Sequence, residues 1–284
     1  MSALQASFAV IGGSGFYSLL ENASELPVTT PYGEPSDVIS VGRIGERNVA
    51  FLPRHGRDHQ YPPHRINYRA NIWALHSIGV RQIIAPCAVG SLQPELGPGS
   101  LVVPDQLVDR TTSRQQTYYD SGAVHVPFAD PYCPQGRSVV LSASRREGMA
   151  VTDHGTMVVV EGQRFSTRAE SQWYAAQGWS LVNMTGLPEA VLARELAICY
   201  TSVALVTDLD AGLDMASAVR QSDVFAVFAE NTARLQSVIL NALSGLPTSR
   251  ECPCKHSLDG ILIAEDIGPD RRPDNEHELA ENKT

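Results

Sequence analysis

The stretch PEAVLARELAICYTSVALVTD, residues 188–208, joins two kinds of pattern. Its first half mixes apolar and charged residues in the manner of an amphipathic helix that starts at Pro188. Its second half is nearly continuous apolar sequence up to Val206, which is typical of a strand covered on both faces. A helix that leads directly into a buried strand predicts an α/β sheet protein.

The same alternation extends over most of the chain. Strand patterns occupy residues 8–13, 48–54, 81–90, 99–109, 157–162 and 180–185, and helix patterns occupy residues 65–79, 167–178 and 222–243. We predict one α/β domain over residues 1–263, with a mixed, mostly parallel central sheet and helices on both faces. Residues 264–284 are acidic with little to bury, and we predict a disordered tail there.

Composition excludes several classes of protein. The 284 residues are 43% hydrophobic and 19% charged, with a formal charge of −9, which argues against a nucleic-acid surface. The N-terminus lacks the pattern of a signal peptide, and no apolar run is long enough for a membrane span. The sequence therefore predicts a cytoplasmic protein that binds neither nucleic acid nor membrane.

The five cysteines are too few and too scattered for a disulfide scaffold. Cys252 and Cys254 lie in the segment ECPCKH, and His256 could join them as a metal ligand. Without a second ligand pair this signal is weak, and a loop fixed by Pro253 is the simpler interpretation. Whether Cys252 and Cys254 pair stays open, and we expect neither a metal nor a cofactor.

Polar features follow several predicted strands, where open α/β sheets bind ligands. The glycine-rich VIGGSG contains Ser14, and such loops hold anions. Arg54 and His55 end the next strand, and an arginine fork suits phosphate oxygens. In APCAVG, Cys87 and Ala88 offer backbone amides, whereas nothing nearby activates the Cys87 thiol. Together these residues are compatible with a phosphate site and equally with plain solvated turns.

The helix that starts near Pro188 adds to this set. Thr185 precedes it, so the hydroxyl and the helix N-terminus favour an anion, although an ordinary helix cap explains the residue equally well. Met184 offers an apolar contact. We expect Glu189 in the first turn to compensate the helix dipole.

Asp208 and Asp210 follow the strand at alternate positions. In an extended backbone they face the same side, so their carboxyls would share one space. One of two neighbouring carboxyls holds its proton and can donate a hydrogen bond, which suits a heterocyclic base. A metal pair and a solvated turn are the alternatives that this stretch leaves open.

Several motifs in order resemble one known family. They are VIGGSG, LPRHGRDH, INYRANIWAL, CAVGSL, VDRT, HVPFADPYC, EGQRFSTRAES, NMTGLPEAVLARE and VTDLDAG. Together they resemble the 5′-methylthioadenosine phosphorylases within the trimeric purine nucleoside phosphorylase family. The match extends from about Phe8 to about Asn241, and it is the ordered set that is specific.

The resemblance implies cleavage of 5′-methylthioadenosine by inorganic phosphate, with adenine and 5-methylthioribose 1-phosphate as products, and a role in purine and methionine salvage. Phosphate is then a co-substrate, and the enzyme is a pentosyltransferase. It also implies a homotrimer with the site at a subunit interface. The motif TDLD favours a 6-aminopurine, because 6-oxopurine members typically carry an Asn in this stretch.

The resemblance also implies a role for each matching residue. Ser14, Arg54, His55, the backbone at Cys87 and Ala88, and Thr185 would hold phosphate. Met184 would lie against the ribose and Phe165 against the base, with Asp208 and Asp210 as base-reading and catalytic residues. His125, in the irregular segment 109–134, would cover the 5′ end of the nucleoside in the neighbouring subunit.

Two departures from the family leave the substrate open. Cys87 replaces a hydroxyl or amide residue, so we expect its backbone to contribute. Gln221 falls about where methylthioadenosine enzymes have an apolar residue, so adenosine or another 5′-modified deoxyadenosine stays a candidate substrate. Other residues that could tune specificity are Ser166, Val224 and Phe225. The rivals are a phosphorylase for 6-oxopurine nucleosides such as 5′-methylthioinosine, and a non-catalytic nucleotide-binding protein.

Overall fold

The computed structural model describes residues 5–13, 16, 19–20, 23–211 and 219–261. The predicted tail at 264–284 and the predicted phosphate ligand Ser14 lie outside the described residues. The strands are β1 (Phe8–Gly12), β2 (Ser24–Leu26), β3 (Ile39–Ile44), β4 (Arg47–Pro53), β5 (Gln82–Ser91), β6 (Leu101–Val102), β7 (Gln106–Arg110), β8 (Val151–Thr152), β9 (Thr156–Val160), β10 (Leu181–Asn183) and β11 (Cys199–Asp208). The helices are α1 (Tyr68–Ser77), α2 (Pro134–Arg146), α3 (Arg168–Ala176), α4 (Gly186–Glu195) and α5 (Gln221–Gly245), with 3₁₀ turns η1 (Pro63–Arg65) and η2 (Pro253–His256).

Within the described residues, the strands form one mixed sheet in the order β2-β3-β4-β1-β5-β10-β9-β7, and β11 adds to β5 and carries β6 and β8. The central pairs β1 with β4, β1 with β5 and β11 with β5 are parallel. The pairs β2 with β3, β3 with β4, β5 with β10 and β6 with β11 are antiparallel. The predicted single α/β domain with a mixed, mostly parallel sheet is confirmed.

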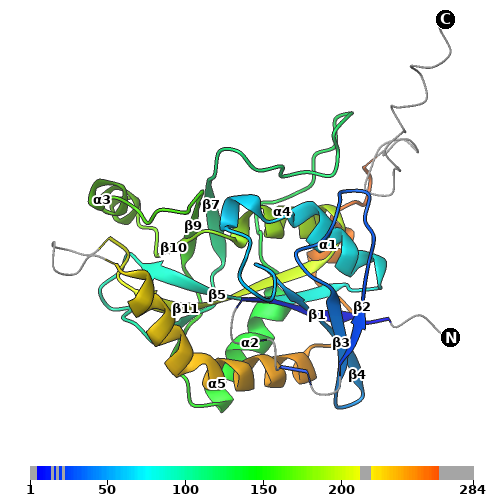
Figure 1. The fold of residues 1–284 in the computed structure, drawn as a ribbon, viewed down its shortest axis with the longest axis horizontal. Helices are drawn as coiled ribbons and strands as arrows, with labels where there is room; N and C mark the ends of the chain where they lie inside the picture. Colours follow the sequence, from blue (N-terminus) through cyan, green and yellow to red (C-terminus); the bar gives the residue numbers. More distant parts are fainter. Residues whose placement is uncertain (1–4, 14–15, 17–18, 21–22, 212–218, 262–284) are drawn as a thin grey trace, which may run out of the picture.

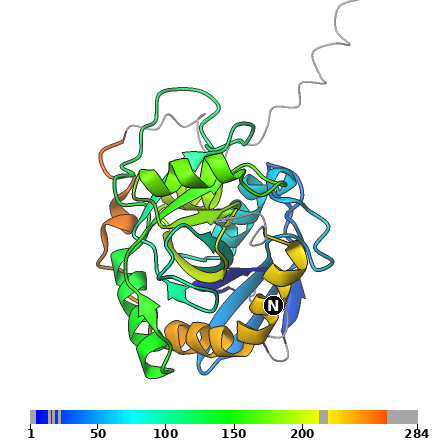
Figure 2. The same cartoon turned by 90° about the vertical axis from the view of Figure 1, so that its left-hand side faces the viewer.

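Helices cover both faces of this sheet, as predicted. Alternation along β1 sends Ala9 and Ile11 to the face packed by α1 and α4, and Phe8 and Val10 to the face packed by α2 and α5. Figure 1 shows α1 and α4 above the sheet and α2 and α5 below it. Figure 2 shows α5, gold to orange, along the lower side from a second direction. No helix in the described part of the chain combines the length and apolar character that a membrane crossing needs.

Three features of the fold were not predicted. Helix α2 has few large apolar residues in PQGRSVVLSASRR, so its buried side at Val140, Leu141 and Ala143 gives a faint periodic signal. Strands β2 and β3 form the outer antiparallel edge of the sheet. The single strand expected at 99–109 is divided into β6 and β7 around Pro104, which has no N–H to donate to a ladder.

Candidate functional site

A pocket of about 510 Å³ lies where β1, β4, β5 and β11 reach their carboxyl ends, and the first turns of α5 form one wall. This volume is in the range of small-molecule sites. The predicted site residues that line it are Arg54, His55, Cys87, Ala88, Phe165, Ser166, Met184, Thr185, Asp208, Asp210, Gln221, Val224 and Phe225. His125 is exposed and does not line the pocket of its own chain.

Arg54 is held at the base of the pocket by a buried ion pair. Its Nε donates to Glu189 Oε1 at 2.5 Å and its Nη2 to Glu189 Oε2 at 3.1 Å. Burial opposes the charge, but the Glu189 carboxylate more than offsets it, so the pKa of Arg54 is raised. Tyr200 also donates to Glu189, at 2.7 Å. Glu189 therefore fixes the position of the Arg54 guanidinium, a role that goes beyond the compensation of the helix dipole predicted from its position in α4.

The remaining donors of Arg54 are also largely engaged. Nη2 donates to the carbonyl of Ile11 at 3.0 Å and Nη1 to the carbonyl of Pro86 at 3.1 Å. A guanidinium has five N–H groups, and these bonds use four of them. Among the described residues, one N–H on Nη1 is left for a ligand. The bidentate edge of Arg54 thus faces Glu189, and phosphate would meet a single N–H.

His55 lies beside Arg54 as a neutral ring. Its Nδ1 is 2.8 Å from the carbonyl oxygen of Tyr61, so Nδ1 carries the proton and donates it. Burial lowers the pKa of His55 to about 4, although the Tyr61 contact favours the charged form. The ring stacks on His59 with centroids 4.4 Å apart. At neutral pH, His55 therefore presents an unprotonated Nε2 that can accept a hydrogen bond from a ligand.

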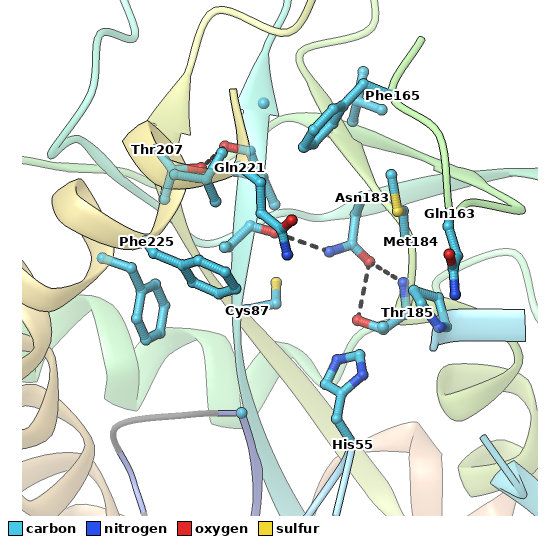
Figure 3. Close-up of a pocket in the computed structure, with 18 of the residues that line it drawn as sticks. His55, Cys87, Gln163, Phe165, Asn183, Met184, Thr185, Thr207, Gln221 and Phe225 are labelled. Carbon is cyan, nitrogen blue, oxygen red and sulfur yellow. Dashed lines mark hydrogen bonds between the residues drawn. The ribbon is translucent and has the colours of Figure 1, made fainter. Parts of the chain in front are cut away.

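Asn183 organises the centre of the pocket, as Figure 3 shows. Strand β10 runs antiparallel to β5, which returns Asn183 over the end of β5. Asn183 Nδ2 donates to the carbonyl of Ala88 at 3.1 Å, and Oδ1 accepts from the N–H groups of Thr185 at 2.7 Å and Gly186 at 2.6 Å. The Thr185 hydroxyl also lies 3.4 Å from Asn183 Oδ1, so it can donate either to Asn183 or to an anion in the pocket.

Cys87 places its side chain as well as its backbone at the pocket, to the left of Asn183 and Thr185 in Figure 3. Burial raises the pKa of the thiol, and its sulfur lies 3.6 Å from the Ser202 hydroxyl. A neutral buried thiol is a weak donor and not an activated nucleophile. The expectation that Cys87 contributes no reactive thiolate fits this environment.

Asp208 ends β11 and presents a carboxyl that holds its proton more tightly than usual. Burial raises the pKa of Asp208 to about 6, with the nearby Asp210 charge adding to the effect. Its Oδ2 accepts from the Thr207 hydroxyl at 2.7 Å and its Oδ1 from the Asp210 N–H at 2.9 Å. At neutral pH this group exchanges readily between acid and carboxylate, as a proton donor must.

Asp210 reaches the same pocket by a different route from the one predicted. Its φ is 48°, in the left-handed region, and the β5–β11 register shifts between Val206 and Asp208. A turn after Asp208, not strand alternation, therefore brings the two carboxyls together. Asp210 accepts hydrogen bonds from the hydroxyls of Ser166 and Ser171. Burial raises the pKa of Asp210 as well.

Gly90 on β5 makes room for this pair. A Cβ at position 90 would lie 2.9 Å from Asp208 Oδ1 and 3.1 Å from the Cα of Asp210. The second contact is with backbone, which cannot rotate away. A larger residue at position 90 would therefore have to displace the Asp208–Asp210 turn, which favours glycine where the ends of β5 and β11 approach each other.

Aromatic side chains form the mouth of the pocket. Phe165 and Phe225 are 37% and 46% exposed, which is high for large apolar residues. Phe225 packs edge-on against His59, with centroids 6.1 Å apart, and Gln221 lies one turn before it on α5. Figure 3 shows His55 at the lower end of the pocket and Phe165 at the upper end. The two ends differ in chemistry, with polar donors below and a ring above.

Sequence reasoning missed four of the residues that shape this site. They are His59, Gly90, Asn183 and Glu189. All four stood inside the quoted motifs, with His59 in LPRHGRDH, Gly90 in CAVGSL, and Asn183 and Glu189 in NMTGLPEAVLARE. Glu189 and Gly90 act through Arg54 and the Asp208–Asp210 turn, and such long-range partners leave no local pattern.

Comparison with known proteins places the chain among phosphorylases. A family model described as the phosphorylase superfamily matches residues 7–244. A purine nucleoside phosphorylase from Streptomyces coelicolor is 56% identical over 269 residues, which cover 91% of this chain and 96% of the relative. An S-methyl-5′-thioadenosine phosphorylase from Mycolicibacterium smegmatis is 58% identical over 244 residues, which cover 86% and 92%.

A solved structure agrees with these relatives. Methylthioadenosine phosphorylase from Schistosoma mansoni in complex with adenine superposes with a TM-score of 0.83 at 36% identity. The match covers 87% of this chain and 93% of that one. The solved structure and the sequence relatives thus both assign the chain to the phosphorylases.

Proposed function

Because this chain belongs to the phosphorylase superfamily, we propose that it cleaves 5′-methylthioadenosine with inorganic phosphate. The products are adenine and 5-methylthioribose 1-phosphate. The observation that carries this proposal is one pocket that holds donors at Arg54 and Thr185, an acceptor nitrogen at His55 and a protonatable carboxyl at Asp208. No cofactor is needed, since phosphate is the second substrate.

The phosphate end is assigned to Arg54, His55, Thr185 and the β5 backbone at Cys87 and Ala88. Glu189 neutralises much of the Arg54 charge, and His55 is neutral, so the cradle carries little net positive charge. His55 Nε2 accepts a hydrogen bond from a protonated phosphate oxygen, which fixes the orientation of that oxygen. The opposite oxygens then face C1′ and stabilise the positive charge that grows on the ribose as the glycosidic bond lengthens.

The base end is assigned to Phe165, Asp208 and Asp210. Asp208 donates its proton toward N7 of the departing purine and neutralises the charge that develops there. Asp210 is occupied by two serine hydroxyls, and its N–H donates to Asp208. It therefore positions Asp208 rather than delivering the proton itself. Met184 contacts the ribose between the two ends.

The 5′ end of the nucleoside is assigned to the wall that the first turns of α5 form, at Gln221, Val224 and Phe225. We propose a homotrimer in which His125 of a neighbouring copy covers this end. The exposure of Phe165 and Phe225 supports this assignment, because a second chain would bury both rings. A cytoplasmic location accords with five cysteines that form no disulfide among the described residues.

A panel of four nucleosides tests the proposal. With phosphate present, we expect kcat/KM for 5′-methylthioadenosine to exceed that for adenosine, and both to exceed those for 5′-methylthioinosine and inosine. The 6-amino preference should be at least tenfold, because a mismatched buried polar group typically costs about 1–3 kcal/mol. Chromatography of the released base gives the values directly. A higher kcat/KM for either 6-oxopurine nucleoside would contradict the proposal.

Adenosine is the second candidate substrate. Gln221 lines the pocket near the assigned 5′ end, and its amide could donate to or accept from a 5′-hydroxyl. The relative from Streptomyces coelicolor, named a purine nucleoside phosphorylase, also keeps this reading open. Gln221→Leu distinguishes the two, since it should lower kcat/KM for adenosine while that for 5′-methylthioadenosine holds or rises.

A further inference from the structure

Four of the five cysteines meet in one buried cluster outside the pocket. Cys133, Cys199, Cys252 and Cys254 are each at most 5% exposed, and their sulfur atoms all lie within 4.8 Å of one another. They come from three separate parts of the chain, and together they form a small core cluster of their own. Four sulfurs at mutual contact are a recognised set of metal ligands.

The fold brings Cys133 and Cys199 together through α2 and β11. The N–H of Cys133 donates to the carbonyl of Tyr200 at 2.8 Å, and Cys133 caps the N-terminus of α2. The N–H of Gly136 donates to the Cys133 sulfur at 3.4 Å. A Cβ at position 136 would lie 2.1 Å from Thr201 Oγ1, so a glycine lets the helix approach the strand this closely.

The η2 turn delivers the other two thiols. Before it, the Arg250 guanidinium donates to the carbonyl of Ala197, and after it the Ser257 hydroxyl donates to the carbonyl of Arg194 at 2.7 Å. The turn is thereby fixed to the segment that leads into β11. His256 is exposed and pairs with Asp259 at 2.6 Å, so it does not belong to the cluster. The partners of Cys252 and Cys254 are cysteines that lie far away in the sequence.

We propose that Cys133, Cys199, Cys252 and Cys254 form a structural tetrahedral site for a zinc ion. Zinc–thiolate bonds of about 2.3 Å place the sulfurs of a tetrahedron about 3.8 Å apart, close to the spacing seen here. Cys199 and Cys252 sulfurs are 3.3 Å apart, compared with about 2.0 Å in a disulfide. Two disulfides would bring the sulfurs of each pair to about 2.0 Å and leave the two pairs independent, whereas here all four sulfurs lie within 4.8 Å of one another.

The surroundings suit a charged zinc–thiolate centre. The four thiols cannot ionise together without a cation, because like charges this close repel. Zinc displaces the four protons and neutralises two of the four negative charges. The N-terminus of α2 and the Gly136 N–H stabilise the remainder, as such donors do at metal–thiolate sites.

The site lies far from the pocket. Cys199 begins β11 and Asp208 ends it, and a strand of this length spans roughly 30 Å. Zinc here would therefore join α2, β11 and η2 without touching substrate. Its loss should lower stability while leaving the kcat of the folded protein unchanged.

Metal analysis of the full chain tests this inference. We expect one zinc per chain after expression with zinc and purification without chelators. Cobalt substitution should give the visible absorption of a tetrahedral cobalt–thiolate site. Cys254→Ser should lower bound zinc at least tenfold, whereas the matched control Cys87→Ser, at the cysteine outside the cluster, should retain it.

The cobalt spectrum of the unmodified chain decides the matter if a variant does not fold. Alkylation of the denatured protein, followed by mass spectrometry, counts thiols and disulfides separately. Disulfides among the four cysteines, or four free thiols that take up neither zinc nor cobalt, would overturn the proposal. Because these readouts do not use activity, they are independent of the proposed phosphorolysis.

Discussion

Asp208→Asn should stabilise the protein while lowering its activity. The pKa of Asp208 rises from 3.8 to about 6 on folding, so the folded state holds a proton that the unfolded state has lost between these pH values. Stability therefore falls as pH rises through this window, and the loss is complete above about pH 6. At about 1.4 kcal/mol for each pKa unit, the loss amounts to about 3 kcal/mol. Asn has no such cost.

The local hydrogen bonds can accommodate the change. Thr207 Oγ1 lies 2.7 Å from Asp208 Oδ2 and 3.2 Å from the carbonyl of Val89. If the hydroxyl donates to Val89, it can accept from the amide of the new Asn. The Asn oxygen can keep the bond from the Asp210 N–H. We expect the unfolding free energy to rise by about 2–3 kcal/mol at pH 8 and to change little at pH 4.

Catalysis should move in the opposite direction. If protonated Asp208 is the acid, kcat/KM at saturating phosphate should fall about tenfold per pH unit above about pH 6. In the variant, kcat/KM should no longer fall above about pH 6. Its kcat should be lower by a factor of about 10²–10⁴, the usual contribution of a general acid. Denaturant unfolding at pH 4 and 8, with pH–rate profiles of both proteins, measures both effects. A variant with wild-type kcat, or one destabilised equally at both pH values, would refute the reasoning.

Three further substitutions probe the same pocket. Glu189→Gln leaves Arg54 buried without its counter-charge and should lower the unfolding free energy by about 3 kcal/mol in denaturant melts, while a change below 1 kcal/mol would contradict the ion pair's role. Gly90→Ala should lower kcat/KM at least tenfold by displacing the carboxyl pair, whereas Gly97→Ala, whose Cβ would meet nothing within 4 Å, serves as the control. His55→Phe should raise the KM for phosphate at least tenfold through loss of the acceptor Nε2, and an unchanged KM would exclude that contact.

The fold and most of the pocket could be predicted because their signals are local. The apolar strand at 200–206 and the polar residues that follow each strand appear within a few positions of one another. Ordered motifs then specified which residues share one site. Helix α2 gave no comparable signal, because small and polar residues such as Ser138 and Ser142 occupy much of its length.

What escaped prediction depends on contacts between distant parts of the chain. Glu189 looked like a helix-start residue until β4 placed Arg54 against it. The closeness of Asp208 and Asp210 was predicted from strand alternation, but a left-handed turn produces it. Cys252 appeared to need His256, whereas its neighbours are Cys133 and Cys199. Each of these contacts depends on how distant segments fold against one another, which the spacing of residues within one segment does not reveal.

The central claim is that phosphate cleaves the glycosidic bond of a 6-aminopurine nucleoside in this pocket. The most direct measurement is incubation of the protein with 5′-methylthioadenosine, with and without phosphate, followed by chromatography of the base and phosphorus NMR of the sugar. We predict adenine and 5-methylthioribose 1-phosphate in equal amounts, and neither product without phosphate. Adenine released without phosphate, or no adenine under either condition, would contradict the account.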